Sequence, residues 1–326
     1  MTIVSFPGLG IGEMTIDKVA FSIGGISVRW YGIILTLGIV AAFFYAVWRA
    51  KFEGFKTDDV IDYAIVTVVL AIIGARTYYV LTTLGKGYYD SFYDVIAIWE
   101  GGIAIYGAII GGALGLLIVS RFKKFGKQKI LRVFDMVAPG VMLGQIIGRW
   151  GNFVNGEAHG VQTGESFFLR MGLHSDVYNR TFYYHPTFLY ESLWNLVGFV
   201  LINLLYKKKK FDGQVLLMYL AWYGFGRMFI EGLRTDSLYI GAFRISQVVG
   251  FLCFVICTAL LVYILLKQKR KELDTESYAP VYERSRGYKL RTKGEESAEN
   301  AAEIDAIISH AKESQENAPR TSEKDE

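Results

Sequence analysis

The sequence predicts an all-α membrane protein with seven transmembrane helices, an N-terminus outside and a C-terminus in the cytoplasm. Three observations predict this fold. Hydrophobic residues make up 52% of the 326 residues, and they gather in long blocks between positions 30 and 266. Seven of these blocks approach the ~20 residues that a helix needs to cross a bilayer. Basic residues cluster in every second connection between the blocks, as is typical of multi-pass membrane proteins.

The expected helices follow from the chain in order. Residues 1–29 lack the basic segment, apolar segment and cleavage site of a signal peptide, so the first apolar block is expected to stay as an anchor. Strands are not expected to cross, because open sheet edges cannot face lipid. The seven expected transmembrane helices cover residues 30–48, 62–82, 102–120, 133–149, 186–206, 214–231 and 245–266.

The basic residues predict the direction of each crossing. Lys and Arg concentrate after the first, third, fifth and seventh blocks, at 49–56, 121–132, 207–210 and 267–271, whereas only Lys86 lies between the second and third. Basic connections stay in the cytoplasm. The N-terminus is then outside and the C-terminus inside, which requires an odd number of crossings.

Two segments complete the predicted organisation. The seven-helix domain covers residues 1–271, and its longest external connection, 150–185, is rich in Gly, Asn and aromatic residues and is expected to form a small head. Residues 272–326 form a charged tail, with ten acidic and three basic residues from position 294 onward. Such a composition cannot build a core, so we expect a disordered cytoplasmic tail.

Polar residues inside the apolar blocks are candidates for a functional site. A charge inside a spanning helix costs roughly 2.5–3.5 kcal/mol on insertion. Arg149 and Arg227 each lie 17 residues, or about 25 Å of helix, beyond the basic residues that mark the inner end of their helices. Both therefore lie in the outer half of the bilayer. The other candidates in the blocks are Arg76, Glu191, Asn195 and Glu231.

Further polar residues fall at the same depth. Tyr31, Tyr106 and His185 begin outside-to-inside helices, so they also lie in the outer half. Two arginines in this layer suggest an anionic ligand, because a guanidinium group matches a phosphate bidentately. The obvious outer-leaflet anion is a phospholipid head group. The competing interpretation is that the arginines are helix caps that reach up to the outer surface.

The densest polar motif is segment 148–160, with the sequence GRWGNFVNGEAHG. This segment resembles the family of prolipoprotein diacylglyceryl transferases, and the resemblance covers about residues 20–266. The residues that match the family pattern are Trp30, Tyr31, Gly32, Arg149, Gly151, Asn152, Phe153, Asn155, Glu157, Gly160, His185, Pro186, Leu189, Tyr190, Glu191, Tyr223, Arg227 and Glu231.

The resemblance implies an activity, its partners and a location. The expected reaction transfers the diacylglyceryl group of phosphatidylglycerol to the lipobox cysteine thiol of an exported prolipoprotein, the first step of lipoprotein maturation. It forms a thioether and releases glycerol phosphate. The partners would be phosphatidylglycerol, membrane lipid and prolipoprotein signal peptides, and the location the bacterial plasma (inner) membrane. No cofactor is expected.

Site roles follow from the resemblance together with position. We expect Arg149 and Arg227 to bind the phosphate and stabilise its departure, and Glu231 to orient Arg227. Glu157 is expected either to orient Arg149 or to accept a proton. The residues expected to bind or shape the substrate are Tyr31, Asn152, Asn155, Gly160, His185, Tyr223 and Arg76. For His185 a structural role is equally consistent with the sequence.

Tyr106 departs from the family pattern. Many members have a His there, regarded as a possible base. A Tyr with a pKa near 10 is a poor base at neutral pH. Either Tyr106 orients a substrate, or another group takes the thiol proton in a cationic site that lowers the thiol pKa.

Other classes of function are less consistent with the sequence. A net charge of +4 is too small to suggest nucleic-acid binding. His159, His174 and His310 lack metal-ligand spacing, so no metal site is expected. Cys253 and Cys257 lie four apart in an apolar block and are expected to be core residues. A transporter is the main alternative, but it needs access from both sides and often has inverted repeats, whereas this sequence shows no internal repeat.

The predicted orientation can be tested by labelling in intact cells. In a chain whose two cysteines are replaced by Ala, Lys208→Cys should resist a membrane-impermeant thiol reagent, because basic connections stay in the cytoplasm. Ser175→Cys, in the external segment, should react and serves as the control. Labelling at position 208 from outside would contradict the orientation.

Overall fold

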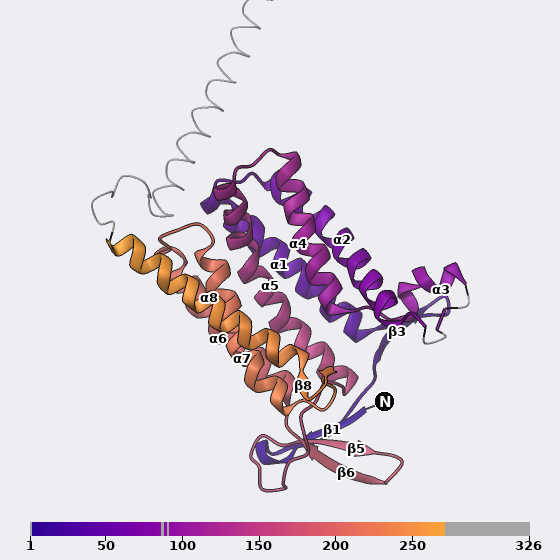
Figure 1. Cartoon of the computed structure of the whole chain (residues 1–326). Helices are drawn as coiled ribbons and strands as arrows, with labels where there is room; N and C mark the ends of the chain where they lie inside the picture. The colour runs from indigo at the N-terminus through magenta and orange to yellow at the C-terminus, as the bar shows by residue number, and fades with distance from the viewer. Residues whose placement is uncertain (1, 86–87, 90, 271–326) are drawn as a thin grey trace, which may run out of the picture.

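The computed structural model describes residues 2–85, 88–89 and 91–270, so the tail expected at 272–326 lies outside the described residues. Helices dominate this part of the chain (Figure 1). Its long helices are α1 (Trp30–Glu53), α2 (Thr57–Thr83), α4 (Ile105–Phe122), α5 (Lys127–Asn155), α6 (Thr187–Tyr206), α7 (Gln214–Leu233) and α8 (Ile245–Arg270).

Six of these helices are long and apolar enough to cross a membrane, namely α1, α2, α4, α5, α6 and α8. Helix α7 has 20 residues, contains Arg227 and Glu231, and is not among these six. Large apolar side chains cover the outside of the bundle; Phe44 and Leu204, for example, are 64% and 68% exposed. Such a surface suits lipid rather than water. The chain is therefore a mostly helical, multi-pass membrane protein.

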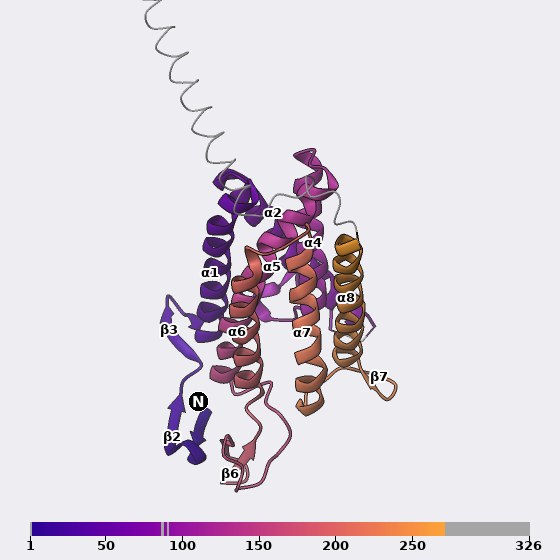
Figure 2. The same ribbon diagram turned by 90° about the vertical axis from the view of Figure 1, so that its left-hand side faces the viewer.

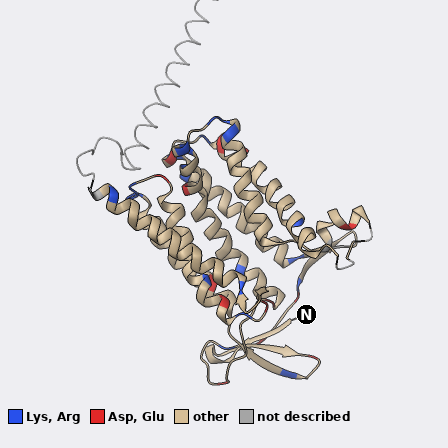
Figure 3. Cartoon of the chain, viewed as in Figure 1, with Lys and Arg blue, Asp and Glu red and all other residues tan. Residues whose placement is uncertain are grey.

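The charged residues lie mainly at the two ends of the bundle (Figure 3). We call the end that carries the connections α1–α2, α4–α5 and α6–α7 the basic end, and the opposite end, beside the sheet, the head end. The N-terminal strands and the last residues of α8 lie at opposite ends of the bundle (Figure 1).

Helix α5 is longer at both ends than the sequence indicated. It begins at Lys127 rather than at residue 133 and ends at Asn155 rather than at 149. Residues 150–155 are therefore helical and not part of the head. A helix can continue past the apolar block because its backbone hydrogen bonds do not depend on lipid. It stops at Gly156, whose left-handed φ of 65° ends the helix.

The prediction of an all-α fold needs correction, because the structure also contains β-strands. Strands β1 (Thr2–Phe6), β2 (Ile11–Ile16), β5 (Met171–Ser175) and β6 (Arg180–Tyr184) form an antiparallel sheet in the order β2-β1-β5-β6. The exclusion of open sheet edges applies only in lipid, so it does not forbid a sheet in water. The remaining short elements are η1 (Pro7–Leu9), β3 (Val19–Ile23), β4 (Ile26–Arg29), α3 (Phe92–Ile96), η2 (Ile98–Glu100), β7 (Tyr239–Ile240) and β8 (Phe243–Arg244).

The head therefore contains the N-terminus as well as the expected external connection. Strand β1 pairs with β2 on one side and with β5 on the other, and its Val4 is fully buried. Figure 2 shows β2 and β6 beyond the ends of the helices. The expected boundaries of the head, 150–185, are thus corrected to residues 2–16 together with the connection between α5 and α6.

Glycines set the closest contacts between helices. A Cβ added to Gly107 in α4 would lie 2.1 Å from the carbonyl oxygen of Gly74 in α2, and one added to Gly111 would lie 2.1 Å from another α2 carbonyl. Helices α7 and α8 approach each other similarly at Gly224 and Gly250. Small residues allow membrane helices to pack through their backbones.

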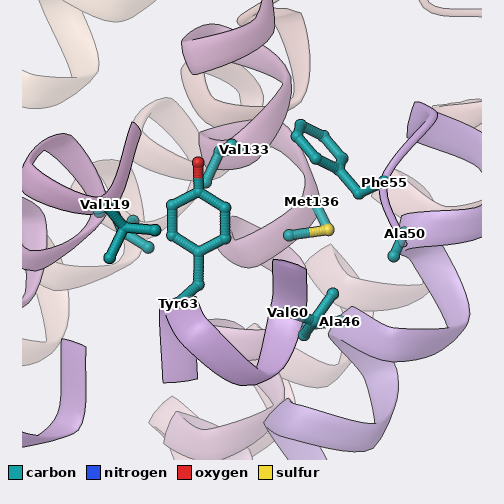
Figure 4. Packing of buried hydrophobic residues seen from close by; sticks show 9 residues of the cluster. Ala46, Ala50, Phe55, Val60, Tyr63, Val119, Val133 and Met136 are labelled. Carbon is teal, nitrogen blue, oxygen red and sulfur yellow. The ribbon is translucent and has the colours of Figure 1, made fainter. Parts of the chain in front are cut away.

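A buried apolar cluster fills the interior of the bundle toward the basic end. It lies where α1, α2, α4 and α5 meet, and Figure 4 shows the ring of Tyr63 among its members. The Tyr63 hydroxyl and Ser120 Oγ are 2.8 Å apart and share a hydrogen bond. The core cluster consists of Ala46, Ala50, Phe55, Val60, Tyr63, Leu116, Val119, Val133 and Met136.

Buried ion pairs join the connections at the basic end. Lys209 Nζ lies 2.6 Å from Glu53 Oε1 and 2.9 Å from Asp135 Oδ2, and all three side chains are fully buried. Lys209 is therefore not one of the surface charges from which orientation is inferred. Its neighbours Lys208 and Lys210 are exposed.

The α2–α4 contact predicts a sharp difference between adjacent glycines. Gly111→Ala should destabilise the protein by about 1–3 kcal/mol, because its Cβ would press on an α2 carbonyl. Gly112→Ala is the control, since its Cβ would meet only side-chain atoms at 3.6 Å or more. Thermal unfolding in detergent measures both. Equal melting temperatures for the two variants would contradict the packing described here.

Candidate active site

The two arginines predicted from the sequence meet on one carboxylate. Arg149 Nη2 in α5 donates to Glu191 Oε1 at 2.5 Å, and Arg227 Nη1 in α7 donates to Glu191 Oε2 at 2.8 Å. The Glu191 side chain, in the first turns of α6, is only 3% exposed. One buried carboxylate thus links three helices and fixes the spacing of two guanidinium groups.

Glu191 was identified in the sequence as a costly charge but was not assigned a role in the site. A helical pattern gives the depth of a residue but not its partner on another helix. The available signal was its location in the same layer as Arg149 and Arg227, the layer where an acidic partner would be needed.

Further partners hold the guanidinium groups. Arg227 Nη2 lies 2.6 Å from Glu231 Oε2, one turn along α7. Arg149 Nη1 donates to Asn152 Oδ1 at 3.3 Å, and Arg149 lies within electrostatic reach of Tyr223. The structure therefore brings together the two arginines, Glu231, Asn152 and Tyr223, as the sequence suggested.

Glu157 contacts Arg149 only indirectly, through the side-chain amide of Asn152. The chain turns back after α5, and Glu157 Oε1 accepts hydrogen bonds from Asn152 Nδ2 and Asn155 Nδ2, both at 3.1 Å. Asn152 in turn accepts from Arg149. Glu157 therefore contacts Arg149 through Asn152, and its two expected roles, to orient Arg149 or to accept a proton, stay predictions.

Two tyrosines border this cluster from other helices. The ring of Tyr31, at the start of α1, packs on Gly151, where an added Cβ would lie 2.8 Å from the ring. Tyr31 is also within electrostatic reach of Glu157. The Tyr106 hydroxyl at the start of α4 shares a 2.8 Å hydrogen bond with Ser246 Oγ of α8, and it lies within electrostatic reach of Arg227.

Arg76 lies apart from the arginine pair. Its guanidinium group donates to the backbone carbonyls of Asp94, Val95, Gly101 and Gly102. These contacts hold the connection that contains α3 against α2. They favour a structural role for Arg76 over the expected role in substrate binding.

Gly160 and His185 tie the head connection to α6. The Gly160 amide donates to the His185 carbonyl at 2.8 Å, and a Cβ at Gly160 would lie 2.7 Å from the His185 Cβ. His185 Nδ1 is 3.1 Å from the Tyr190 hydroxyl. These contacts favour the structural role that was left open for His185, and they show that Gly160 permits close approach between two segments.

Two arginines in the connection after α7, Arg234 and Arg244, form a basic rim that was not predicted from the sequence. Arg234 donates to both carboxylate oxygens of Asp236, at 3.0 and 2.7 Å. Partial burial raises the pKa of Asp236, but the hydrogen bonds from Arg234 outweigh it and hold the pKa below its ordinary value. Arg244 donates to the Glu231 carbonyl. Both arginines lie in the short connection between two apolar blocks, and this position is the feature of the sequence that could have indicated them.

A polar layer continues below the arginines. Asn195 lies one turn after Glu191 on α6 and is fully buried; within the described residues its amide has no hydrogen-bond partner. Gln145 of α5 donates to the Tyr219 hydroxyl at 3.0 Å. The interior between α5, α6 and α7 is therefore polar for more than one helical turn.

The arrangement suits an oxyanion. Each guanidinium has five N–H donors, and the contacts above engage two groups on each arginine. Their side chains remain 20% and 13% exposed. Because Glu191 and Glu231 balance the two positive charges, binding would depend on directed hydrogen bonds more than on net charge. Across the described part of the chain, no three His, Cys, Asp or Glu residues are grouped to hold a metal ion.

Comparison with known proteins shows the family. A model of the prolipoprotein diacylglyceryl transferase family matches residues 18–263. A phosphatidylglycerol–prolipoprotein diacylglyceryl transferase from Listeria welshimeri is 43% identical over 263 residues, which cover 79% of this chain and 94% of the relative. The enzyme of that name from Clostridium kluyveri is 44% identical over 260 residues, 79% of this chain and all of the relative. The chain therefore belongs to the prolipoprotein diacylglyceryl transferase family.

Proposed function

We propose that this protein transfers the diacylglyceryl group of phosphatidylglycerol to the thiol of a lipobox cysteine in exported prolipoproteins. The observation that carries the proposal is the pair of guanidinium groups that Glu191 holds side by side. The names of the similar enzymes specify phosphatidylglycerol as donor and a prolipoprotein as acceptor.

The proposed setting is the bacterial plasma membrane, crossed seven times. Helix α7 is the proposed seventh span. It packs between α6 and α8, and its charged residues pair inside the bundle, as charges in spanning helices do. An odd number of crossings, such as seven, puts the two ends of the chain on opposite sides of the membrane. The N-terminal strands and the end of α8 do lie at opposite ends of the bundle. We propose that the head end faces outward and the basic end faces the cytoplasm.

The proposed reaction is alkyl transfer to sulfur. A bond forms between the cysteine sulfur and the glyceryl carbon, while the bond between that carbon and the phosphate oxygen breaks. The electron pair of the broken bond leaves with glycerol phosphate. Arg149 and Arg227 stabilise the charge that develops on the phosphate, because donors aimed at a developing anion act strongly in a site that excludes water.

The thiol must also lose its proton. The cationic groups of the site favour the thiolate, and Glu157 is the proposed proton acceptor, held in place by two amides. Asn152 and Asn155 are proposed to contact the glycerol or the incoming peptide. Tyr31, Tyr106 and Tyr223 shape the walls around them.

Replacement of the arginines by Lys tests the phosphate clamp. Lys keeps the charge but lacks the planar fork, and removal of one donor to a developing anion typically costs ~10²–10³ in rate. Arg149→Lys and Arg227→Lys should therefore insert normally but lose most transfer to a lipobox peptide. Arg121→Lys, at an exposed position of the basic end, is the control and should keep full activity. Near-normal turnover by both site variants would end the clamp hypothesis.

Replacement of Glu157 by Gln separates its two possible roles. Gln keeps an oxygen that can accept from Asn152 and Asn155, but it cannot take a proton. If Glu157 is the base, kcat should fall by about 10²–10⁴ with little change in KM, and the dependence of kcat on pH should change shape. Glu165→Gln, exposed on the head, is the control. Wild-type turnover by Glu157→Gln would assign Glu157 to positioning alone.

A further inference from the structure

The connection from α7 to α8 contains a short hairpin with exposed apolar side chains. Its strands β7 and β8 pair antiparallel, and we refer to residues 238–244 as the β7–β8 hairpin. Leu238, Ile240 and Phe243 are 63%, 70% and 70% exposed. Large apolar side chains that gather on a surface mark a site of contact with a protein or a membrane. The hairpin is therefore expected to have an apolar partner.

The two faces of the hairpin differ in polarity. Residues directly opposite each other on paired strands share a face, and the pairs are Tyr239 with Arg244 and Ile240 with Phe243. The second pair makes one face apolar. On the other face Arg244 Nε donates to the Tyr239 hydroxyl at 2.8 Å, and Arg244 also donates to a backbone carbonyl in the last turns of α7. The polar face thus binds to the protein itself, while the apolar face is left exposed.

The apolar face continues onto the lipid-facing side of α8. Strand β8 leads directly into this helix, which begins at Ile245, and the Ile245 amide donates to the Leu238 carbonyl at 2.9 Å. Val248, Val249 and Leu252 follow on the same side of the helix as Ile245 and are 39%, 41% and 48% exposed. Helix α8 is long and apolar enough to cross a membrane. The hairpin therefore extends a surface that faces lipid.

The hairpin lies at the depth of the lipid head groups. It connects the head ends of two helices, since α7 ends at Leu233 and α8 begins at Ile245. Figure 2 shows it extending sideways from the end of α8 at the level of the helix ends, whereas β6 lies beyond that level. The polar layer of a bilayer adds about 5–7 Å to the hydrocarbon on each side. A hairpin that extends sideways in this layer meets lipid rather than bulk water.

We propose that the apolar face of the β7–β8 hairpin inserts into the leaflet at the head end, with the lipid surface as its partner. Amphipathic segments lie in this layer with the apolar face toward the acyl chains. The proposal rests on α8 crossing the membrane and not on the proposed reaction. Because Arg244 links the hairpin to the Glu231 carbonyl, insertion holds the rim of the arginine site at the level of the lipid phosphates.

A fluorescent probe on the hairpin tests the proposal. In a chain whose two cysteines are replaced by Ala, Ile240→Cys is labelled with the environment-sensitive fluorophore NBD. The full-length protein is placed in nanodiscs of phosphatidylcholine and phosphatidylglycerol, which leave both membrane faces open to solutes. Lipids with a nitroxide near the top of the acyl chain should quench the probe several-fold more strongly than they quench a probe in water. Iodide in the buffer should quench it several-fold less.

Val177→Cys is the matched control. Val177 also lies at the tip of a hairpin, between β5 and β6, and it is 87% exposed, but this hairpin lies beyond the helix ends (Figure 1). Its probe should be quenched by iodide and not by the nitroxide lipid. If Ile240→Cys does not fold, Phe243→Cys carries the probe on the same face. A hairpin probe that responds to both quenchers as the Val177 probe does overturns the proposal.

A charge on the apolar face gives an independent test. Phe243→Asp should draw the Ile240 probe out of the lipid and raise its quenching by iodide several-fold, because a charge is costly in hydrocarbon. Phe243→Leu should leave the quenching unchanged. If the charge has no effect, the proposal fails. It also fails if the probe is shielded only after a lipobox peptide is added, which would assign the face to the acceptor peptide, or only in nanodiscs that hold two copies of the protein.

Discussion

The ion pairs on Glu191 are the interaction on which the rest of the site depends. One buried carboxylate accepts a guanidinium from α5 and another from α7, so three helices are joined at a single point. Loss of one partner from a buried ion pair leaves an uncompensated charge and is strongly destabilising. Glu191 therefore both permits two arginines in the membrane region and sets their spacing. That spacing matters chemically, because a phosphate can be held by two guanidinium groups only if both point to the same place.

The packing of the bundle serves this contact. Glycines bring α2 against α4 and α7 against α8 at backbone distance, and the buried ion pairs of Lys209 join the connections at the basic end. The bundle is thus fixed at one end by charges and a closed apolar core, while its other end carries the polar site.

The sequence predicted the features that depend on depth and failed on those that depend on partners. Apolar blocks and basic connections located the long helices, and counting from Arg132 and Lys210 placed Arg149 and Arg227 in one layer. Their shared partner Glu191 could not be deduced, because one helix pattern does not say which face meets which neighbour. For Arg76 too the sequence gives the depth but not the partners: its guanidinium group donates to backbone carbonyls, which favours a structural role. The sheet was missed because the rule against open edges holds only in lipid.

A structure with phosphatidylglycerol bound would show whether Glu191 spaces Arg149 and Arg227 to hold one phosphate. If it does, the phosphorus lies between the two guanidinium groups, with phosphate oxygens within about 3 Å of nitrogens of both, while both ion pairs to Glu191 persist. A phosphate bound at the rim by Arg234 or Arg244, with Arg149 and Arg227 engaged only by carboxylates, would contradict it.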